Sequence, residues 1–249
     1  MLWGTFGIVH IATLLLSASM ITALYFILRK SSERVQTLVL GILSFTGIAA
    51  IIFNLVTWNS PLEYLPLHLC SLSAMVLPFA VFTRSRVLNN LLLLWGLGAI
   101  LAIVVNTAQA NYQVFSLTFA FYYFPHTFEF GVVLLMFLLG RVKLDPRCIG
   151  STLAITFLAY TAAHFINLAV NDYCATNEVL DWAGNVVKVN YMYSLVPENP
   201  IFALFYSICP YEFWYVLLSM PIIIVYLAAI YAKQILRGIK ERKNKEHRS

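Results

Sequence analysis

Long apolar stretches separated by short polar segments dominate the sequence. Seven of these stretches are long enough to cross a bilayer as a helix, which takes about 20 residues. They cover residues 3–28, 35–57, 64–82, 88–105, 117–139, 149–170 and 205–234. The pattern predicts an all-α polytopic membrane protein, a bundle of seven transmembrane helices. Residues 1–234 would form one transmembrane domain with a long external loop over 171–204, followed by a basic tail over 235–249.

Composition narrows the class of protein further. The 249 residues include only 16 basic and 11 acidic ones, and 61% are apolar. Soluble domains carry about 25% charged and about 45–50% apolar residues. A soluble enzyme, a disordered chain and an ordinary nucleic-acid binder are therefore excluded. The first apolar stretch lacks a preceding basic segment and is longer than the core of a signal peptide, so we predict a retained membrane helix.

The basic residues are distributed unevenly between the polar segments. Fifteen of the 16 follow the first, third, fifth or seventh apolar stretch, and only Lys188 falls on the other side. Because cytoplasmic loops carry the excess of Lys and Arg, this distribution predicts an external N-terminus and a cytoplasmic C-terminus. The pI near 9.0 therefore reports topology, and no nucleic-acid partner is expected.

Several ionisable side chains fall inside the predicted helices. Unpaired charge is costly in a bilayer, so each is a candidate functional residue. They are His10, Glu63, His68, Cys70, His126, Glu129, His164 and Glu212. At a rise of about 1.5 Å per residue, most of them lie in the outer half of the membrane. This shared depth predicts a common polar cavity open toward the outer face.

The spacing of these residues indicates which of them work together. His126 and Glu129 are three apart and share one helix face, where a carboxylate would orient the imidazole as a general base. Such a pair can also serve only to lock its helix. Cys70 is two residues from His68, and such residues point to nearly opposite helix faces. We therefore expect a partner for Cys70 from another helix, either His126 or His164.

Cysteine and metal chemistry leave further alternatives. A thiol near a histidine is a possible nucleophile, whereas a lone cysteine in a membrane helix often only fills space. Cys174 and Cys209 are both predicted to be external and could pair as a disulfide in an oxidising compartment, but two cysteines alone do not decide whether they pair. The histidines and carboxylates lack the H-x-x-x-H, H-E-x-x-H and C-x-x-C spacings of zinc sites, so we expect neither a metal nor a cofactor.

Five short motifs resemble those of the YwaF-like integral membrane proteins of bacteria. They are FGIVH at 6–10, LPLHLCS at 65–71, the aromatic-then-His segment at 124–126, NYMYSL at 190–195 followed by Pro200, and WY at 214–215. The most distinctive is P-x-H-x-C-S, and its combination with N-Y-x-Y is fairly specific. The resemblance covers essentially the whole chain. It implies a multi-pass protein of the bacterial plasma membrane.

The eukaryotic branch of that family is the transmembrane protein 164 group, described as membrane acyltransferases that move fatty acyl chains between phospholipids without coenzyme A. The resemblance implies phospholipid or lysophospholipid substrates. It implies that Cys70 is the nucleophile and His126 its base, with His164 as the competing base. The expected catalytic residues are Cys70, His126, Glu129 and His68, and the expected substrate-binding residues are His10, His164, Asn167, Asn190, Tyr191 and Tyr193.

Three functions stay open at this point. The first is a lipid acyltransferase or lipid hydrolase with a cysteine nucleophile. The second is a transporter or channel, which the buried His, Glu and amide side chains favour but for which no inverted repeat is visible. The third is a non-catalytic lipid-binding scaffold. The oligomeric state is not indicated by the sequence.

Overall fold

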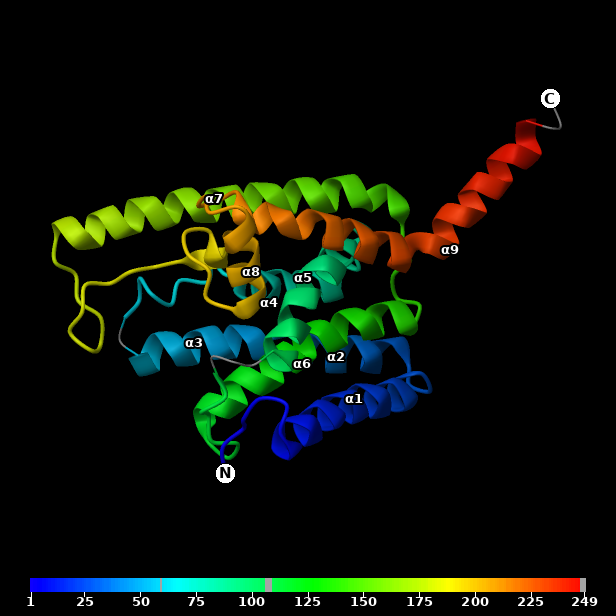
Figure 1. The fold of residues 1–249 in the computed structure, drawn as a ribbon. Coiled ribbons are helices and arrows are strands. Elements are labelled where there is room, and N and C mark those ends of the chain that lie inside the picture. The colour runs from blue at the N-terminus through cyan, green and yellow to red at the C-terminus, as the bar shows by residue number, and fades with distance from the viewer. Residues whose placement is uncertain (59, 106–108, 247–249) are drawn as a thin grey trace.

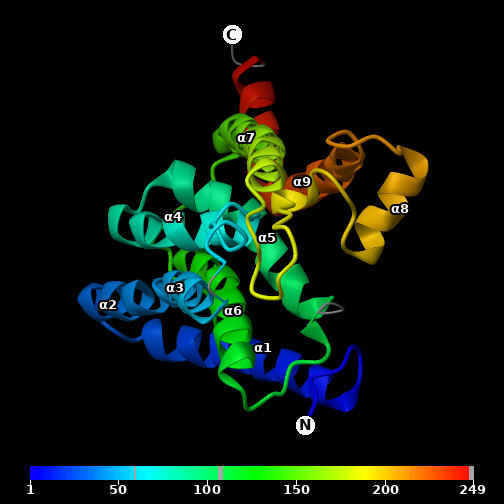
Figure 2. The ribbon, with the colours of Figure 1, turned by 90° about the vertical axis from the view of Figure 1, so that its left-hand side faces the viewer.

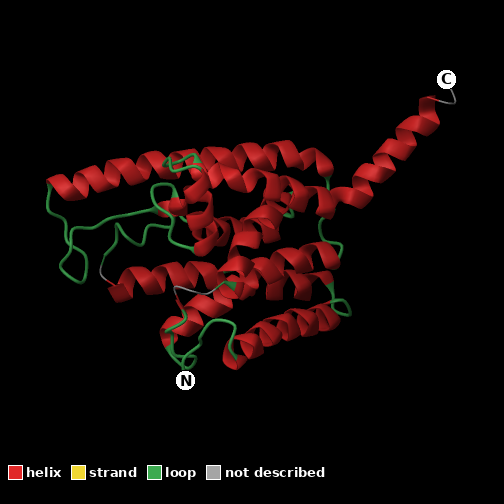
Figure 3. Ribbon diagram, viewed as in Figure 1, coloured by secondary structure: helices red, strands yellow, loops and turns green. Residues whose placement is uncertain are grey.

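The protein folds as a bundle of helices (Figures 1 and 3). The structure, a computed structural model, describes residues 1–58, 60–105 and 109–246, with side chains described as far as residue 240. The helices are α1 (Ile8–Leu28), α2 (Glu33–Ser44), α3 (Thr46–Trp58), α4 (Leu69–Thr83), α5 (Arg86–Val104), α6 (Leu117–Leu138), α7 (Ile149–Thr176), α8 (Pro200–Ile208) and α9 (Met220–Glu246), with 3-10 turns η2 (Pro146–Cys148), η3 (Tyr191–Tyr193) and η4 (Tyr215–Ser219). Within this described part there is no β-strand, only two isolated bridges.

The predicted all-α membrane fold is confirmed. Six helical segments are long and apolar enough to cross a bilayer, with α2 and α3 together forming one of them. The remaining apolar helix, α4, has 15 residues. At about 1.5 Å per residue it extends about 22 Å, less than the roughly 30 Å of a hydrocarbon core. The count of seven full spans therefore stays a prediction.

Several boundaries differ from the apolar stretches. The stretch 205–234 is not one helix, because α8 ends at Ile208 and α9 begins only at Met220. Pro210 lies between them and has no N–H to continue a helix, and Phe213 adopts a positive φ of 65°. Helix α7 runs on to Thr176, so the external loop is shorter than predicted, and α9 continues into the predicted basic tail.

Helices α5 and α6 form the centre of the bundle. The α5 segment from Leu91 to Trp95 is buried on every side. Helix α6 packs against α1, α2, α3, α4 and α5. The approach of α1 is close, since a Cβ on Gly131 of α6 would lie 2.8 Å from the Ile21 side chain. Figure 2 shows α1, α2, α3 and α6 on one side and α7 and α9 on the other.

The basic connections meet at one end of the bundle, on the right in Figure 1. Glu33, at the start of α2, forms ion pairs with Arg84 at 3.2 Å and with Arg141 at 3.0 Å. These contacts join the connections after α1, α4 and α6. Helix α9 reaches the same end, where Tyr231 donates a hydrogen bond to Asn90 of α5 at 2.5 Å. The side chains of residues 241–249, with four basic residues of the predicted tail, lie outside the described part.

The end that carries the basic residues should face the cytoplasm. Green fluorescent protein fused after residue 249 should fluoresce in cells, and alkaline phosphatase fused there should be inactive because its disulfides need an oxidising compartment. Fusions after Gly184, in the loop at the opposite end, should give the reverse pair of results. Active phosphatase at the C-terminus would contradict the predicted orientation.

Candidate functional site

The polar residues expected to share one cavity lie in three separate places. His10 lies near the N-terminus, against α5 and Trp3. Cys70, His126 and Glu129 lie between α4 and α6. His164 and Glu212 line a pocket between α7 and the segment before α9. A common depth in the membrane therefore does not correspond to a common cavity.

His10 is a fully enclosed anchor of the N-terminal segment. Its Nδ1 accepts a hydrogen bond from the Phe6 N–H at 2.8 Å, and its Nε2–H donates to the Ile103 carbonyl at 2.7 Å. The Trp3 ring meets the imidazole edge-on, with centroids 5.5 Å apart. Both ring nitrogens are used inside the protein, so neither is left for a substrate.

Between α4 and α6 lies a group that we call the central cluster: Cys70, Tyr122, His126, Glu129 and Tyr193. Tyr122, His126 and Glu129 are spaced by four and three residues, so they share one face of α6. Cys70 comes from α4 and is close enough to Tyr122, Tyr193 and Glu129 for their charges to interact. Glu129 interacts in the same way with His126. The structure therefore gathers three of the predicted catalytic residues.

Cys70 occupies the first turn of α4. His68 is the N-cap residue and makes no side-chain capping bond. The Ser71 hydroxyl and the backbone N–H groups of Cys70 and Ser71 lie near the Cys70 sulfur. Unpaired N–H groups at a helix start carry partial positive charge and favour an anion. The sulfur thus lies where a thiolate, or an oxyanion beside it, would be stabilised.

His126 is held by its own helix. Pro125 has no N–H to bond the carbonyl one turn earlier, which loosens the hydrogen-bond ladder of α6 at this point. The His126 Nδ1 lies 2.7 Å from the Tyr122 carbonyl. A carbonyl only accepts, so Nδ1 carries the proton and Nε2 has a free lone pair. This is the tautomer that a general base needs.

Glu129 is buried against α3 and α4. Its Oε1 would lie 2.8 Å from a Cβ on Gly47, and that Cβ would also lie 2.4 Å from the Cβ of Ala74. The Glu129 Oε2 and the hydroxyl of Ser73 are both buried without a hydrogen-bond partner in the described structure. Among the described side chains no hydrogen bond or ion pair joins Glu129 to His126, so their interaction is through space.

Two asparagine side chains of α7 hold the loop segment 189–194. The amide of Asn167 donates to the Tyr191 carbonyl at 2.9 Å and accepts from the Tyr191 N–H at 2.8 Å. Asn171 forms the same pair with Val189, at 2.9 and 2.7 Å. Asn167, predicted to bind substrate, is therefore occupied by the protein backbone.

The other loop residues predicted to bind substrate also have structural partners. The Asn190 amide donates to the Val196 carbonyl at 2.8 Å and to Glu198 at 2.7 Å. The buried Tyr191 donates its hydroxyl to the Leu62 carbonyl. Tyr193 differs, because its positive φ of 57° turns its ring to within 5.5 Å of the His68 ring. His68 accepts from the Met192 N–H through Nδ1 at 3.3 Å.

Tyr193 is the one loop residue of the prediction that joins the central cluster. Burial raises the pKa of Tyr193 to about 12, with Cys70 and then Glu198 adding to the rise. The hydroxyl is therefore protonated at neutral pH and can donate a hydrogen bond. Its carbonyl accepts from the Tyr215 hydroxyl, which fixes the turn from behind.

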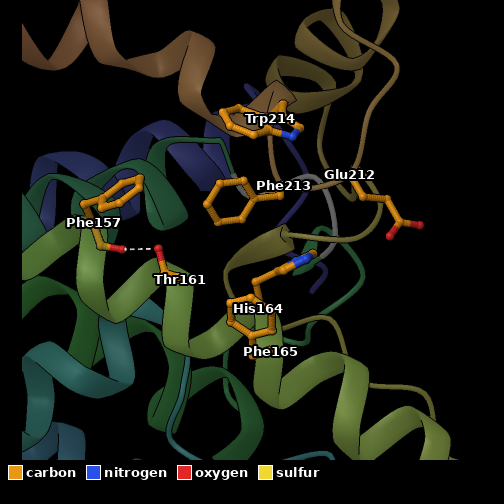
Figure 4. Close-up of a pocket in the computed structure, with 7 residues that line it drawn as sticks. All are labelled: Phe157, Thr161, His164, Phe165, Glu212, Phe213 and Trp214. Carbon is orange, nitrogen blue, oxygen red and sulfur yellow. Dashed lines mark hydrogen bonds between the residues drawn. The ribbon is translucent and has the colours of Figure 1, made fainter.

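The third place is a pocket of about 350 Å³ beside the middle of α7 (Figure 4). His164 lines it, and its Nδ1 lies 3.1 Å from the buried Ser194 hydroxyl. Ser194 also accepts from Asn167 at 2.9 Å. We refer to this pocket as the outer pocket.

Two residues of these sites were not among those predicted. Tyr122 is four residues before His126, so the same spacing rule that paired His126 with Glu129 predicts its position. Ser194 has no such signal in the sequence. A disulfide between Cys174 and Cys209 is absent, since both are free thiols and Cys174 is fully buried. Among the described residues no three His, Cys, Asp or Glu side chains lie together as a metal site.

Comparison with known families settles the assignment. The model of the TMEM164 family matches residues 5–231. The chain belongs to the TMEM164 family. The matched range contains His10, the central cluster and the outer pocket, so all three belong to the TMEM164-family part of the chain. Searches of curated proteins and of solved structures found no match.

The close approach of α3 to Glu129 gives a test of this TMEM164-family packing. Gly47→Ala should lower the thermal unfolding midpoint, because the added Cβ would overlap Ala74 and Glu129. Overpacking of this kind costs about 1–3 kcal/mol. Gly150→Ala on α7 is the control, since its Cβ meets nothing within 4 Å and alanine is the better helix former by about 1 kcal/mol. Equal shifts for both variants would contradict the tight contact at Gly47.

Proposed function

We propose that this protein is an integral membrane lipid acyltransferase or lipid hydrolase that works without coenzyme A. Its substrate would be a glycerophospholipid, and Cys70 would carry the acyl group as a thioester. The observation that carries the proposal is the position of Cys70. Its sulfur lies on the N-terminal turn of α4 and interacts with Glu129, the carboxylate that also interacts with His126.

The first half of the reaction would transfer the acyl group to the protein. His126 Nε2 takes the thiol proton, and the Cys70 thiolate attacks the ester carbonyl of the lipid. The tetrahedral intermediate collapses with cleavage of the ester C–O bond. The leaving alkoxide takes the proton back from His126 and departs as a lysophospholipid.

The second half would transfer the acyl group onward. The hydroxyl of a lysophospholipid or of water loses its proton to His126 and attacks the thioester carbonyl. The C–S bond breaks, and the Cys70 thiolate regains the proton from His126. A lysophospholipid acceptor gives acyl transfer, whereas water gives hydrolysis.

Hydrogen-bond donors near Cys70 would stabilise the oxyanion of both intermediates. The N–H groups of Cys70 and Ser71 belong to the first turn of α4 near the sulfur, so they suit an oxyanion formed on the carbon bonded to it. The protonated Tyr193 hydroxyl is a second source of donors. Glu129 would favour the imidazolium that forms when His126 holds the proton.

The depth of Cys70 suits an ester substrate. Helix α4 is about 8 Å shorter than a bilayer core if its basic end lies at the cytoplasmic boundary. Cys70 would then lie about that far below the outer boundary, near the ester groups of the outer leaflet. Buried apolar side chains of Leu77, Leu92 and Leu135 fill the core between this level and the basic end. That packing favours the enzyme over a channel.

The nucleophile is tested by substitution of Cys70. Full-length protein in lipid nanodiscs would be given phospholipid with a labelled acyl chain and unlabelled lysophospholipid. Cys70→Ala should reduce transfer to background and abolish covalent labelling of the protein, because none of the other free cysteines belongs to the central cluster. Cys209→Ala, on the same side of the bundle but outside the central cluster, should retain both. A labelled and active Cys70→Ala protein would rule out Cys70 as the nucleophile, and wild-type protein without any transfer would favour the scaffold.

The base is tested by comparing two histidines. His126→Gln should lower kcat by about 10²–10⁴-fold with little change in KM, because it removes proton transfer without removing a surface of the lipid site. His164→Gln should leave kcat unchanged and raise KM, since His164 lines the outer pocket away from Cys70. The reverse split between kcat and KM would assign the base to His164.

A further inference from the structure

The outer pocket combines aromatic walls with an unpaired carboxylate. Its lining residues are Phe157, Thr161, His164, Phe165, Glu212, Phe213 and Trp214. The Glu212 carboxylate has no hydrogen bond or ion pair in the described structure, and no Lys or Arg lines the pocket. Figure 4 shows the Phe213 and Trp214 rings close together and the Glu212 side chain to their right, extending away from them.

The pocket contains both enclosed and exposed aromatic rings. Phe213 meets Phe157 edge-on at 6.2 Å and Trp214 edge-on at 5.3 Å, and it also lies at 30° to the Tyr160 ring, with centroids 5.0 Å apart. Phe165 and Trp214 are themselves exposed, 64% and 60% accessible, so their rings are available to a ligand. Ring faces carry negative electrostatic potential and attract alkylated ammonium groups.

Negative charge is not balanced in this region. Glu212 and Glu198 both interact electrostatically with Tyr215, which lies between η3 and the start of α9. Glu198 accepts a hydrogen bond from the Asn190 amide, a neutral group. Glu212 is exposed on the protein surface, and a carboxylate at the border of the apolar part of a membrane favours a cation as its partner. No positively charged side chain in the described part of the protein therefore accompanies Glu212. A ligand can supply the missing positive charge.

The position of the pocket favours a lipid as the source of that cation. His164 lies about 22 Å along α7 from Ile149, in the outer part of a bilayer core about 30 Å thick. Ser194 accepts from Asn167, so its own proton is available to His164 Nδ1. The His164 Nε2–H is then a donor on the pocket wall, suited to a phosphate next to an ammonium group.

From this charge complementarity we propose that the outer pocket binds the alkylated ammonium headgroup of a zwitterionic phospholipid. The aromatic faces and Glu212 hold the ammonium group, and His164 contacts the phosphate. Binding here does not require Cys70 to act as a nucleophile. The pocket and the central cluster lie on two sides of the loop segment, which contributes Tyr193 to one and Ser194 to the other.

Native mass spectrometry of the purified full-length protein tests the proposal. Phosphatidylcholine, phosphatidylethanolamine and phosphatidylglycerol with identical acyl chains would be added separately. The wild type should retain phosphatidylcholine about tenfold more than phosphatidylglycerol, the order expected for one desolvated cation–carboxylate and aromatic contact. Glu212→Gln should lose this preference. Asp172→Asn, which removes one exposed carboxylate from α7 outside the pocket, should keep it.

Equal retention of phosphatidylcholine and phosphatidylglycerol by the wild type would overturn the proposal, as would the same behaviour of Glu212→Gln and Asp172→Asn. Phosphatidylethanolamine has an ammonium group without methyl groups, so the wild type should retain less of it than of phosphatidylcholine. Equal retention of these two lipids would assign the preference to the carboxylate and overturn the requirement for an alkylated ammonium group. If Glu212→Gln fails to fold, a competition experiment on the wild type tests the proposal instead.

In that experiment tetramethylammonium chloride should displace phosphatidylcholine from the wild type, whereas sodium chloride at equal ionic strength should not. Equal effects of the two salts would overturn the proposal. If the protein binds free choline but retains phosphatidylcholine and phosphatidylglycerol equally, the ammonium group belongs to a soluble compound instead of a lipid.

Discussion

The paired hydrogen bonds from Asn167 and Asn171 to the loop backbone are the contacts on which both candidate sites depend. Each amide replaces the partner that a neighbouring strand would provide, so a chain without β-sheet can hold an extended segment firmly against a helix. The turn that follows places Tyr193 beside Cys70 and Ser194 beside His164. Loss of one amide would therefore alter the chemistry on both sides of the loop.

The bilayer imposes a second constraint, through the length of α4. A helix of 15 residues that begins at Leu69 leaves its first turn inside the molecule instead of at the membrane surface. The unpaired N–H groups of that turn cannot be solvated by lipid, and they lie near the Cys70 sulfur. The start of this short helix thus accounts for the polar surroundings of the thiol.

Membership of the TMEM164 family, the all-helical membrane fold and the gathering of basic residues at one end all follow from patterns along the chain. The shared face of His126 and Glu129 was also predictable, because a spacing of three residues on a helix fixes it, whereas the spacing left the partner of Cys70 open between His126 and His164. The break between α8 and α9 was missed, since hydropathy stays high across Pro210 and does not report backbone direction. The single shared cavity was wrong because depth along a helix says nothing about which side of the bundle a residue faces.

Sequence by itself determined which segments form apolar helices, which ends carry charge and which polar residues share a helix face, because these depend on neighbours within a few residues. Tertiary structure alone decided that both nitrogens of His10 are used internally, that Asn167 binds backbone, and that His164 and Glu212 line a separate pocket. Those outcomes depend on contacts such as His10 with Ile103 and Asn167 with Tyr191, between residues far apart in the chain. The rotation of each helix about its axis sets such contacts, and it depends on how the helices pack against one another.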